Sequence, residues 1–400
     1  MSDTIMRPPH IPEDRVVDFD FLNPPGAEED VQIAWAELHK HPELVWTPHN
    51  GGHWIATRAD VIEQVQSDFQ HFSHEAGISL PMGLKPTRYL PLEADPPEHT
   101  QYRQVLNPSF GPVRIAALKE DARQLTIEII EGLYSKGGCE FIGEFAEVLP
   151  VTIFLRIVDL PLSEREKFLQ WAVEAIRIGT PETRRQAFLR ISDYLGDLIV
   201  ERRKNPGSDL ISKLVTHKFN DVPMTHEQAL GMTLVLFIGG LDTVANMLAF
   251  IVLFLARHPE HRRRLVEDPA LIPAAVEELV RRHGLTNTVR TVKSDFVFRG
   301  VQLKKGDIVQ VPTALHGLDE TRFPHAREVD FDRGPVNHAV FGNGPHRCIG
   351  APLARAELAV FIEEWLKRIP DFEVAPGSQI KTHSANVMNI EKLPLVWVVT

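Results

Sequence analysis

Cysteine is scarce in this chain: only Cys139 and Cys348 occur among its 400 residues. Two cysteines cannot build the disulfide framework of a small secreted protein or a multi-cysteine zinc cluster. The N-terminal stretch carries acidic residues and prolines where a secretory signal needs an apolar run. We therefore expect a protein of the reducing cytoplasm.

An excess of positive charge is also lacking, because 43 Lys and Arg face 54 Asp and Glu, for a net charge of −11. Nucleic acids and anionic membranes attract basic surfaces, so neither is expected as a partner. One apolar run, residues 229–256, is long enough to span a bilayer. It carries Asp242 near its middle, where a charge costs about 3 kcal/mol or more in a bilayer. We predict a helix buried by other protein rather than a membrane span.

Apolar residues at helical spacing dominate the rest of the chain. The fold class we predict is mostly α with a small β portion, in one domain over residues 1–400. The predicted helices are 29–40, 59–70, 97–106, 114–133, 163–176, 184–204, 229–256, 272–282 and 351–369. Strand signals occur in 52–58, 295–313 and 393–399. The Pro-, Asp- and Arg-rich stretch 318–341 has little periodicity, and loops of this length are usually functional.

Cys348 lies in the glycine-rich sequence FGNGPHRCIG, from Phe341 to Gly350. Glycines there permit left-handed or close backbone geometry, and an amphipathic helix follows at once. A helix N-terminus favours a thiolate, which serves as a nucleophile or as a metal ligand. The basic side chains His346 and Arg347 suit a haem ligated by one thiolate. A catalytic thiol and a purely structural loop remain the alternatives.

A second motif, Gly239-Gly240-Leu-Asp242-Thr243, interrupts the buried helix. Each glycine costs about 1 kcal/mol in a helix interior relative to alanine. The pair therefore allows either close packing of another helix or the approach of a ligand to the backbone. In the second case Asp242 and Thr243 place a carboxylate and a hydroxyl beside the ligand, as a proton relay requires.

The third motif is Glu278-x-x-Arg281, whose side chains share one helix face and can pair. Together and in this order, the three motifs resemble those of the cytochrome P450 family, in which Arg333 would join the ion pair. The stretches NGGHWIATR, DPPE, GVQLKKGD, RIPDF and LPLVW extend the resemblance to the camphor-hydroxylating bacterial branch, over residues 8–397. A single triangular, mostly helical domain that encloses haem b is what the resemblance implies.

The family's site residues carry over to matching positions. Cys348 would be the proximal iron ligand, Thr243 would assist oxygen activation and Asp242 would bring in protons. The other positions implied to contact the cofactor are Arg103, Arg290, His346, His99, Gly239, Gly240, Phe341 and Gly350. The positions implied to line the substrate pocket are Ile78, Thr87, Tyr89, Val235, Ile238, Thr286, Asn386 and Val387.

The substrate implied is compact and apolar, a monoterpenoid or a norisoprenoid such as an ionone. Camphor itself is doubtful, because Thr87 occupies the position of the tyrosine that faces the camphor ketone, and Tyr89 lies two residues on. The glycine- and proline-rich stretch 74–89 resembles an access lid.

The resemblance implies a monomeric haem-thiolate monooxygenase that uses O2 and electrons from an acidic [2Fe–2S] ferredoxin with an NAD(P)H-dependent reductase. Arg103, Arg347 and Arg355 would form the docking patch for the ferredoxin. Two alternatives are a haem-thiolate peroxygenase or dehydratase and a non-catalytic helical ligand-binding protein.

Overall fold

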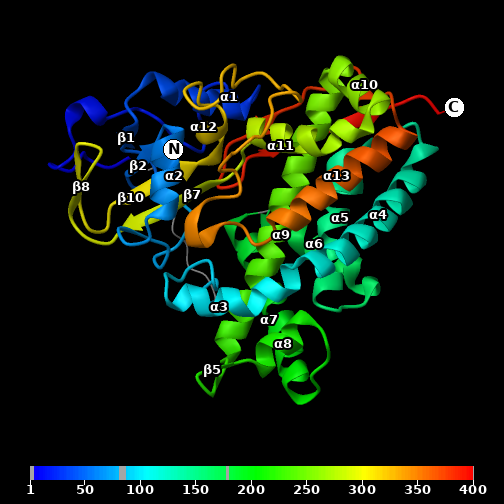
Figure 1. The fold of residues 1–400 in the computed structure, drawn as a ribbon, viewed down its shortest axis with the longest axis horizontal. Helices are drawn as coiled ribbons and strands as arrows, with labels where there is room; N and C mark the ends of the chain where they lie inside the picture. Colours follow the sequence, from blue (N-terminus) through cyan, green and yellow to red (C-terminus); the bar gives the residue numbers. More distant parts are fainter. Residues whose placement is uncertain (1–3, 81–86, 177–179, 400) are drawn as a thin grey trace.

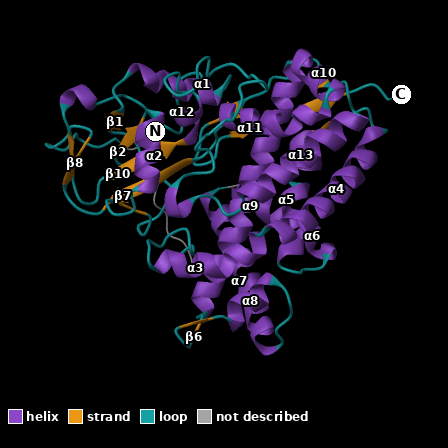
Figure 2. Cartoon of the chain, viewed as in Figure 1, coloured by secondary structure: helices purple, strands orange, loops and turns teal. Residues whose placement is uncertain are grey.

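The computed structural model describes residues 4–80, 87–176 and 180–399. Helices make up most of it and the strands gather mainly on one side (Figures 1 and 2). The α-helices are α1 (Val31–Ala36), α2 (Ala59–Ser67), α3 (Glu98–Leu106), α4 (Pro112–Tyr134), α5 (Val148–Ile157), α6 (Arg165–Ile176), α7 (Pro181–Lys204), α8 (Leu210–Thr216), α9 (His226–Arg257), α10 (Pro259–Glu267), α11 (Ile272–Arg282), α12 (Thr313–Gly317) and α13 (Ala351–Arg368). The predicted fold class is confirmed.

The largest sheet has the strand order β1-β2-β10-β7-β3. Strand β10 pairs antiparallel with β7, where Val309 lies opposite Arg290, and parallel with β2. Its strands are β1 (Leu44–Thr47), β2 (His53–Ala56), β3 (Phe72–Ser73), β7 (Asn287–Val292) and β10 (Ile308–Pro312). The smaller sheets contain β4 (Gly138–Glu140), β5 (Lys218–Phe219), β6 (Val222–Pro223), β8 (Phe296–Phe298), β9 (Val301–Leu303), β11 (Glu373–Val374), β12 (Thr382–His383), β13 (Asn389–Ile390) and β14 (Pro394–Val396).

Helix α9 runs through the middle of the helical region (Figure 1). It begins with a capping box, in which the Thr225 side chain accepts from the Gln228 N–H and Gln228 bonds back to the Thr225 N–H. By length and composition α9 could cross a membrane, but 61% of its most apolar window is buried inside the protein. This burial fits the predicted core helix, whose apolar surface is covered by other helices.

Two apolar clusters flank α9. One joins the large sheet to α4, α13 and the C-terminal half of α9. The other joins α5, α6, α7 and α8 to the N-terminal half of α9. Because one helix contributes to both clusters, the middle of α9 is the place where they meet. That place carries the Gly-Gly-Leu-Asp-Thr motif.

Candidate functional site

The cysteine loop connects the long stretch after α12 to the start of α13. The Cys348 N–H donates to the Phe341 carbonyl at 2.8 Å and closes the loop. Gly342 and Gly344 have φ angles of 73° and 67°, in the left-handed region that favours glycine. A methyl group at Gly344 would lie 2.8 Å from the Ser67 Cα, so glycine is what lets this loop lie against α2.

Gly350 does not have the left-handed or close backbone geometry that we expect for the glycines of this loop. Its φ of −79° is helical, and a methyl group added there would make an ordinary contact at 3.8 Å from the Cys348 sulfur. Glycine at this position is therefore not explained by backbone strain.

The surroundings of the Cys348 thiol have two opposite effects on its pKa. The protein packed around the sulfur raises its pKa, while the backbone N–H groups of Gly350 and Ala351 and the Arg103 guanidinium lower it. The net shift is upward, although the two N–H groups favour the thiolate as expected for a helix N-terminus. The residue still keeps an exposed face, and a coordinating metal deprotonates a thiol outright. Cys348 is thus an accessible thiol that becomes an anion when a metal binds it.

Three histidines and two arginines gather beside this loop. The rings of His74 and His346 stack at 3.5 Å between centroids, and the ring of His99 lies 4.1 Å from that of His346. Arg103 and Arg290 are close enough to lower the pKa of His346 further. Within the described part of the chain, His74 Nε2, His99 Nδ1, His346 Nε2 and Arg290 Nε are buried without a hydrogen-bond partner.

The pKa values of this basic cluster reflect its burial. Burial and the neighbouring cations lower the pKa of His346 to about 2 and that of His99 to about 4. Burial also lowers the pKa of Arg290 to about 9. Asp95 faces the cluster, but its carboxylate accepts from the His74 backbone N–H and from Lys293. Arg290 Nε is therefore a buried donor without an acceptor, and His99 Nδ1 and His346 Nε2 can donate when the neutral ring carries its proton there.

The haem that the resemblance implies fits these residues. It carries two propionate carboxylates, which accept hydrogen bonds of the kind that Arg290 Nε, His99 Nδ1 and His346 Nε2 can donate. His74 Nδ1 already donates to the Leu92 carbonyl, so His74 Nε2 would donate only from a protonated ring. His74 belongs to this cluster but was not predicted from the sequence. The one signal for His74 in the sequence is its position before the DPPE stretch. The Asp95 carboxylate of that stretch accepts a hydrogen bond from the His74 backbone N–H.

The glycine pair lies in the middle of α9 and does not open the helix, which is continuous from His226 to Arg257. Gly239 and Gly240 are exposed although buried residues flank them. A methyl group at either position would meet no protein atom within 4 Å. Close packing of another helix therefore does not explain the glycines, and the approach of a ligand to the backbone remains.

The polar residues of this motif are held within α9. The Thr243 hydroxyl donates to the Gly239 carbonyl at 2.7 Å, and the Asn246 amide donates to Asp242 at 2.7 Å. Asp242 also lines a void of about 10 Å³ between α9 and α6, together with Glu147, Leu169, Ala172, Val173, Leu241 and Ala245. A void of this size holds about one water molecule.

The Glu278, Arg281 and Arg333 side chains meet in one buried cluster. Arg281 donates from Nε and Nη2 to Glu278 at 2.7 Å each, and Arg333 Nε donates to the same carboxylate at 2.9 Å. Arg281 also donates to the carbonyls of Gly317, Ala326 and Glu328. The cluster thereby ties α11 to the long stretch that leads to the cysteine loop.

The residues predicted to line the pocket are only partly brought together. Thr286 and Val387 form an isolated antiparallel bridge, and Ile78 bonds to Val289 through its carbonyl. The Asn386 amide bonds to both backbone groups of Leu80, so it fixes the segment that carries Ile78. The other four residues predicted to line the pocket are all half-buried. Two of them, Val235 and Ile238, lie on α9, and the other two, Thr87 and Tyr89, lie before α3.

Residues 81–86, in the predicted lid, lie outside the described residues. Tyr89 beside them packs against the apolar cluster around α5–α8. Burial, with the nearby Glu93, raises the pKa of the Tyr89 phenol to about 12. The phenol therefore keeps its proton near neutral pH and can donate it to an oxygen acceptor.

Comparison with protein families gives a match to the cytochrome P450 model over residues 180–396, more than half of the chain. A probable cytochrome P450 127A1 of Sinorhizobium fredii is 31% identical, over 98% of this chain and 96% of the relative. The mycinamicin IV hydroxylase/epoxidase of Micromonospora griseorubida is 33% identical, over 76% of this chain and 79% of the relative.

Solved structures agree over the full length. The crystal structure of CYP101C1 superposes with a TM-score of 0.92 at 40% identity, covering 98% of this chain and 100% of the other. That of CYP101J2 gives a TM-score of 0.90 at 38% identity, covering 99% and 100%. These matches agree with the branch predicted from the sequence.

Proposed function

The chain belongs to the cytochrome P450 family and is a haem-thiolate monooxygenase, and we propose that Cys348 is the ligand of its iron. Support comes from its place directly before α13, where the sulfur receives two backbone N–H groups. The other cysteine, Cys139, is half-buried in β4, where burial raises its pKa to about 12. Cys139 is therefore a poor candidate ligand.

The propionates of the haem are assigned to the basic cluster, with His74 added to Arg103, Arg290, His99 and His346. The single observation that carries this assignment is the set of buried ring and guanidinium nitrogens that lack partners. A buried donor without an acceptor costs about 1–3 kcal/mol, so two carboxylates here would relieve several such penalties. Gly239 and Gly240 would lie against the opposite face of the haem.

Thiolate-ligated haem supplies oxygen activation, in which O2, two electrons and two protons convert a C–H bond to C–OH and release water. The protein must bring the protons to the reacting side. Asp242, the carboxylate of the motif, would bring in these protons, since it borders a void with room for about one water. Glu147 borders the same void and would exchange protons with solvent. Thr243 would orient the proton donor from its place one helical turn after Gly239.

The substrate we propose is a compact apolar terpenoid, a monoterpenoid or a norisoprenoid such as an ionone. Half of the positions assigned to its pocket are aliphatic: Val235 lies one turn before Gly239, Ile238 directly precedes it, and Ile78 and Val387 lie near β7. Tyr89 would supply the one phenol donor for a ketone oxygen, because its pKa of about 12 keeps it protonated. Apolar walls with a few placed polar groups are typical of such pockets.

Electrons would come from a separate redox partner in the cytoplasm, an acidic [2Fe–2S] ferredoxin. Of the three arginines assigned to the docking patch, Arg355 is bound to Glu277 through both ends of its guanidinium and lies 4.4 Å from the Phe341 ring. Arg347 is exposed and Arg103 half-buried. Arg347 is therefore the residue whose charge reversal should slow the first electron transfer most. We also propose that residues 1–400 form one domain, because α9 belongs to both apolar clusters.

The substrate proposal is tested by titrating ferric holoenzyme with camphor, β-ionone and the macrolide mycinamicin IV, and by product analysis with a reconstituted ferredoxin system. A high-spin shift of the Soret band with camphor or β-ionone, and an alcohol product, would support it. A shift with the macrolide alone would refute it. A Tyr89→Phe variant should weaken the binding of β-ionone, which has a ketone, more than that of its parent hydrocarbon.

A further inference from the structure

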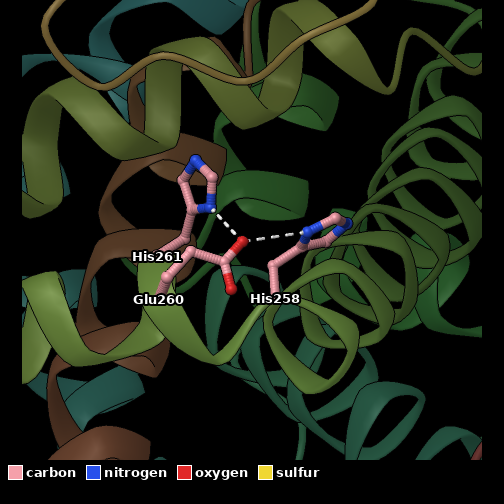
Figure 3. A group of neighbouring side chains, drawn as sticks. All are labelled: His258, Glu260 and His261. Atoms are coloured by element: carbon pink, nitrogen blue, oxygen red, sulfur yellow. Dashed lines mark hydrogen bonds and ion pairs between the residues drawn. The ribbon is translucent and has the colours of Figure 1, made fainter.

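Two histidines and a glutamate meet where α9 ends and α10 begins, far along the chain from the cysteine loop (Figure 3). His258 caps α10, and Glu260 and His261 lie in its first turn. One oxygen of Glu260 faces Nδ1 of His258 at 3.2 Å and Nδ1 of His261 at 3.1 Å. The three side chains thus direct three potential metal ligands toward one point.

The hydrogen bonding of His261 restricts where its protons can be. Its Nε2 lies 3.0 Å from the Val329 carbonyl, which only accepts, so Nε2 carries a hydrogen. In a neutral ring Nδ1 then has a lone pair, and it faces the Glu260 carboxylate, which is also an acceptor. The two acceptors repel unless a proton or a metal cation lies between them. A histidine that donates its other N–H to a carbonyl is also the usual arrangement of a metal ligand.

Two of the three distances between the ligand atoms match those of a tetrahedral site. With metal–ligand bonds of about 2.0–2.1 Å, neighbouring ligand atoms of a zinc site lie about 3.3 Å apart. Both histidine–glutamate distances are near this value, and the three ligand atoms all lie within 4.8 Å of one another. Phe254 positions both rings, stacked on His258 at 4.3 Å and edge-on to His261 at 5.1 Å.

Two of the positive charges near the cluster are already neutralised by carboxylates. Arg262 pairs with Asp371, and Arg264 pairs with Asp332 at 2.8 Å. Two imidazoles and a carboxylate suit a borderline divalent ion such as Zn²⁺ rather than Mg²⁺ or Ca²⁺, which prefer oxygen ligands.

We propose that His258, Glu260 and His261 form a surface site for Zn²⁺ or a similar divalent transition metal, with water as the fourth ligand. The site joins the end of α9 to the long stretch before the cysteine loop, through the bond from His261 to Val329. The next residue, Asp330, donates its N–H to Glu278 of the buried ion-pair cluster at 2.9 Å. A bound ion would therefore hold the His261 ring in the orientation that bonds to Val329.

The test is calorimetric titration of tag-free holoenzyme with Zn²⁺, in which haem already occupies the thiolate ligand. We expect one site that weakens tenfold or more in Glu260→Gln and in His258→Asn. Both substitutions are conservative, since glutamine keeps the shape of an exposed side chain and asparagine is a favoured N-cap residue. His41→Ala, which removes an exposed histidine elsewhere, should bind as the wild type does.

X-ray absorption of the zinc-loaded holoenzyme provides a second readout. We expect two imidazole ligands and only nitrogen or oxygen neighbours. Absence of Zn²⁺ binding, equal binding by wild type and Glu260→Gln, or a sulfur neighbour that places the ion on a cysteine would each overturn the proposal.

Discussion

Replacing Arg281 by lysine probes the buried ion-pair cluster. The Arg281 guanidinium makes five hydrogen bonds: two to Glu278 and one each to the carbonyls of Gly317, Ala326 and Glu328. Its side chain is 0% exposed. Lysine keeps the charge but offers three donors around one nitrogen, so at least two of the five hydrogen bonds are lost.

The magnitude follows from the cost of each lost partner. A hydrogen bond made by a charged group contributes about 1.5–3 kcal/mol, so the loss of two of them in Arg281→Lys should lower the free energy of unfolding by about 3–6 kcal/mol. The total stability of a protein is about 5–15 kcal/mol. Arg281→Met should be worse, because it also leaves Glu278 with Arg333 as its one remaining cation. We expect little folded protein from Arg281→Met.

The assay is urea unfolding of the holoenzyme, followed by far-ultraviolet circular dichroism and by Soret absorbance. Arg185→Lys is the matched control, because Arg185 pairs with Glu182 at the same i,i+3 spacing on α7 with both side chains more than 60% exposed. The control should unfold at the wild-type urea concentration, since exposed pairs contribute little. A wild-type midpoint for Arg281→Lys would refute the reasoning.

Three further predictions concern the glycine pair, the basic cluster and a buried histidine. Gly240→Ala should leave the folded protein at least as stable, because alanine favours helix and meets no atom within 4 Å, whereas Gly240→Leu should lower the haem content measured by the ratio of Soret to protein absorbance. His346→Phe should speed haem transfer to apomyoglobin by removing a donor, and an unchanged rate would contradict the propionate assignment. Burial lowers the pKa of His53 from 6.5 to about 4. Between these pH values His53 is therefore protonated in the unfolded chain but neutral in the folded protein. Stability should fall by about 3 kcal/mol as the pH drops from 6.5 to 4, at 1.36 kcal/mol for each pKa unit, and His53→Asn should remove this part of the acid sensitivity in urea titrations at several pH values.

Local patterns predicted most of the long helices but missed several short ones, among them α8, α10 and α12, and the apolar α5. Helix α5, with the sequence VLPVTIFLRI, is apolar nearly all round and almost wholly buried, so it shows no helical period. Strand β7, which carries Arg290, was also missed. Its buried positions do not alternate strictly, because it lies inside the sheet between β10 and β3.

The sequence by itself determined the order of the motifs and the glycine-rich loop around Cys348, because glycine conformation and helical periodicity act between near neighbours in the chain. The resemblance of these motifs to those of a known family implied the cofactor. Only the tertiary structure decided that His74 stacks on His346 and that burial raises the pKa of Cys348. It also decided that open space, rather than another helix, faces Gly239 and Gly240. The physical reason is that desolvation and contact depend on which distant segments pack together, and no local pattern records that packing.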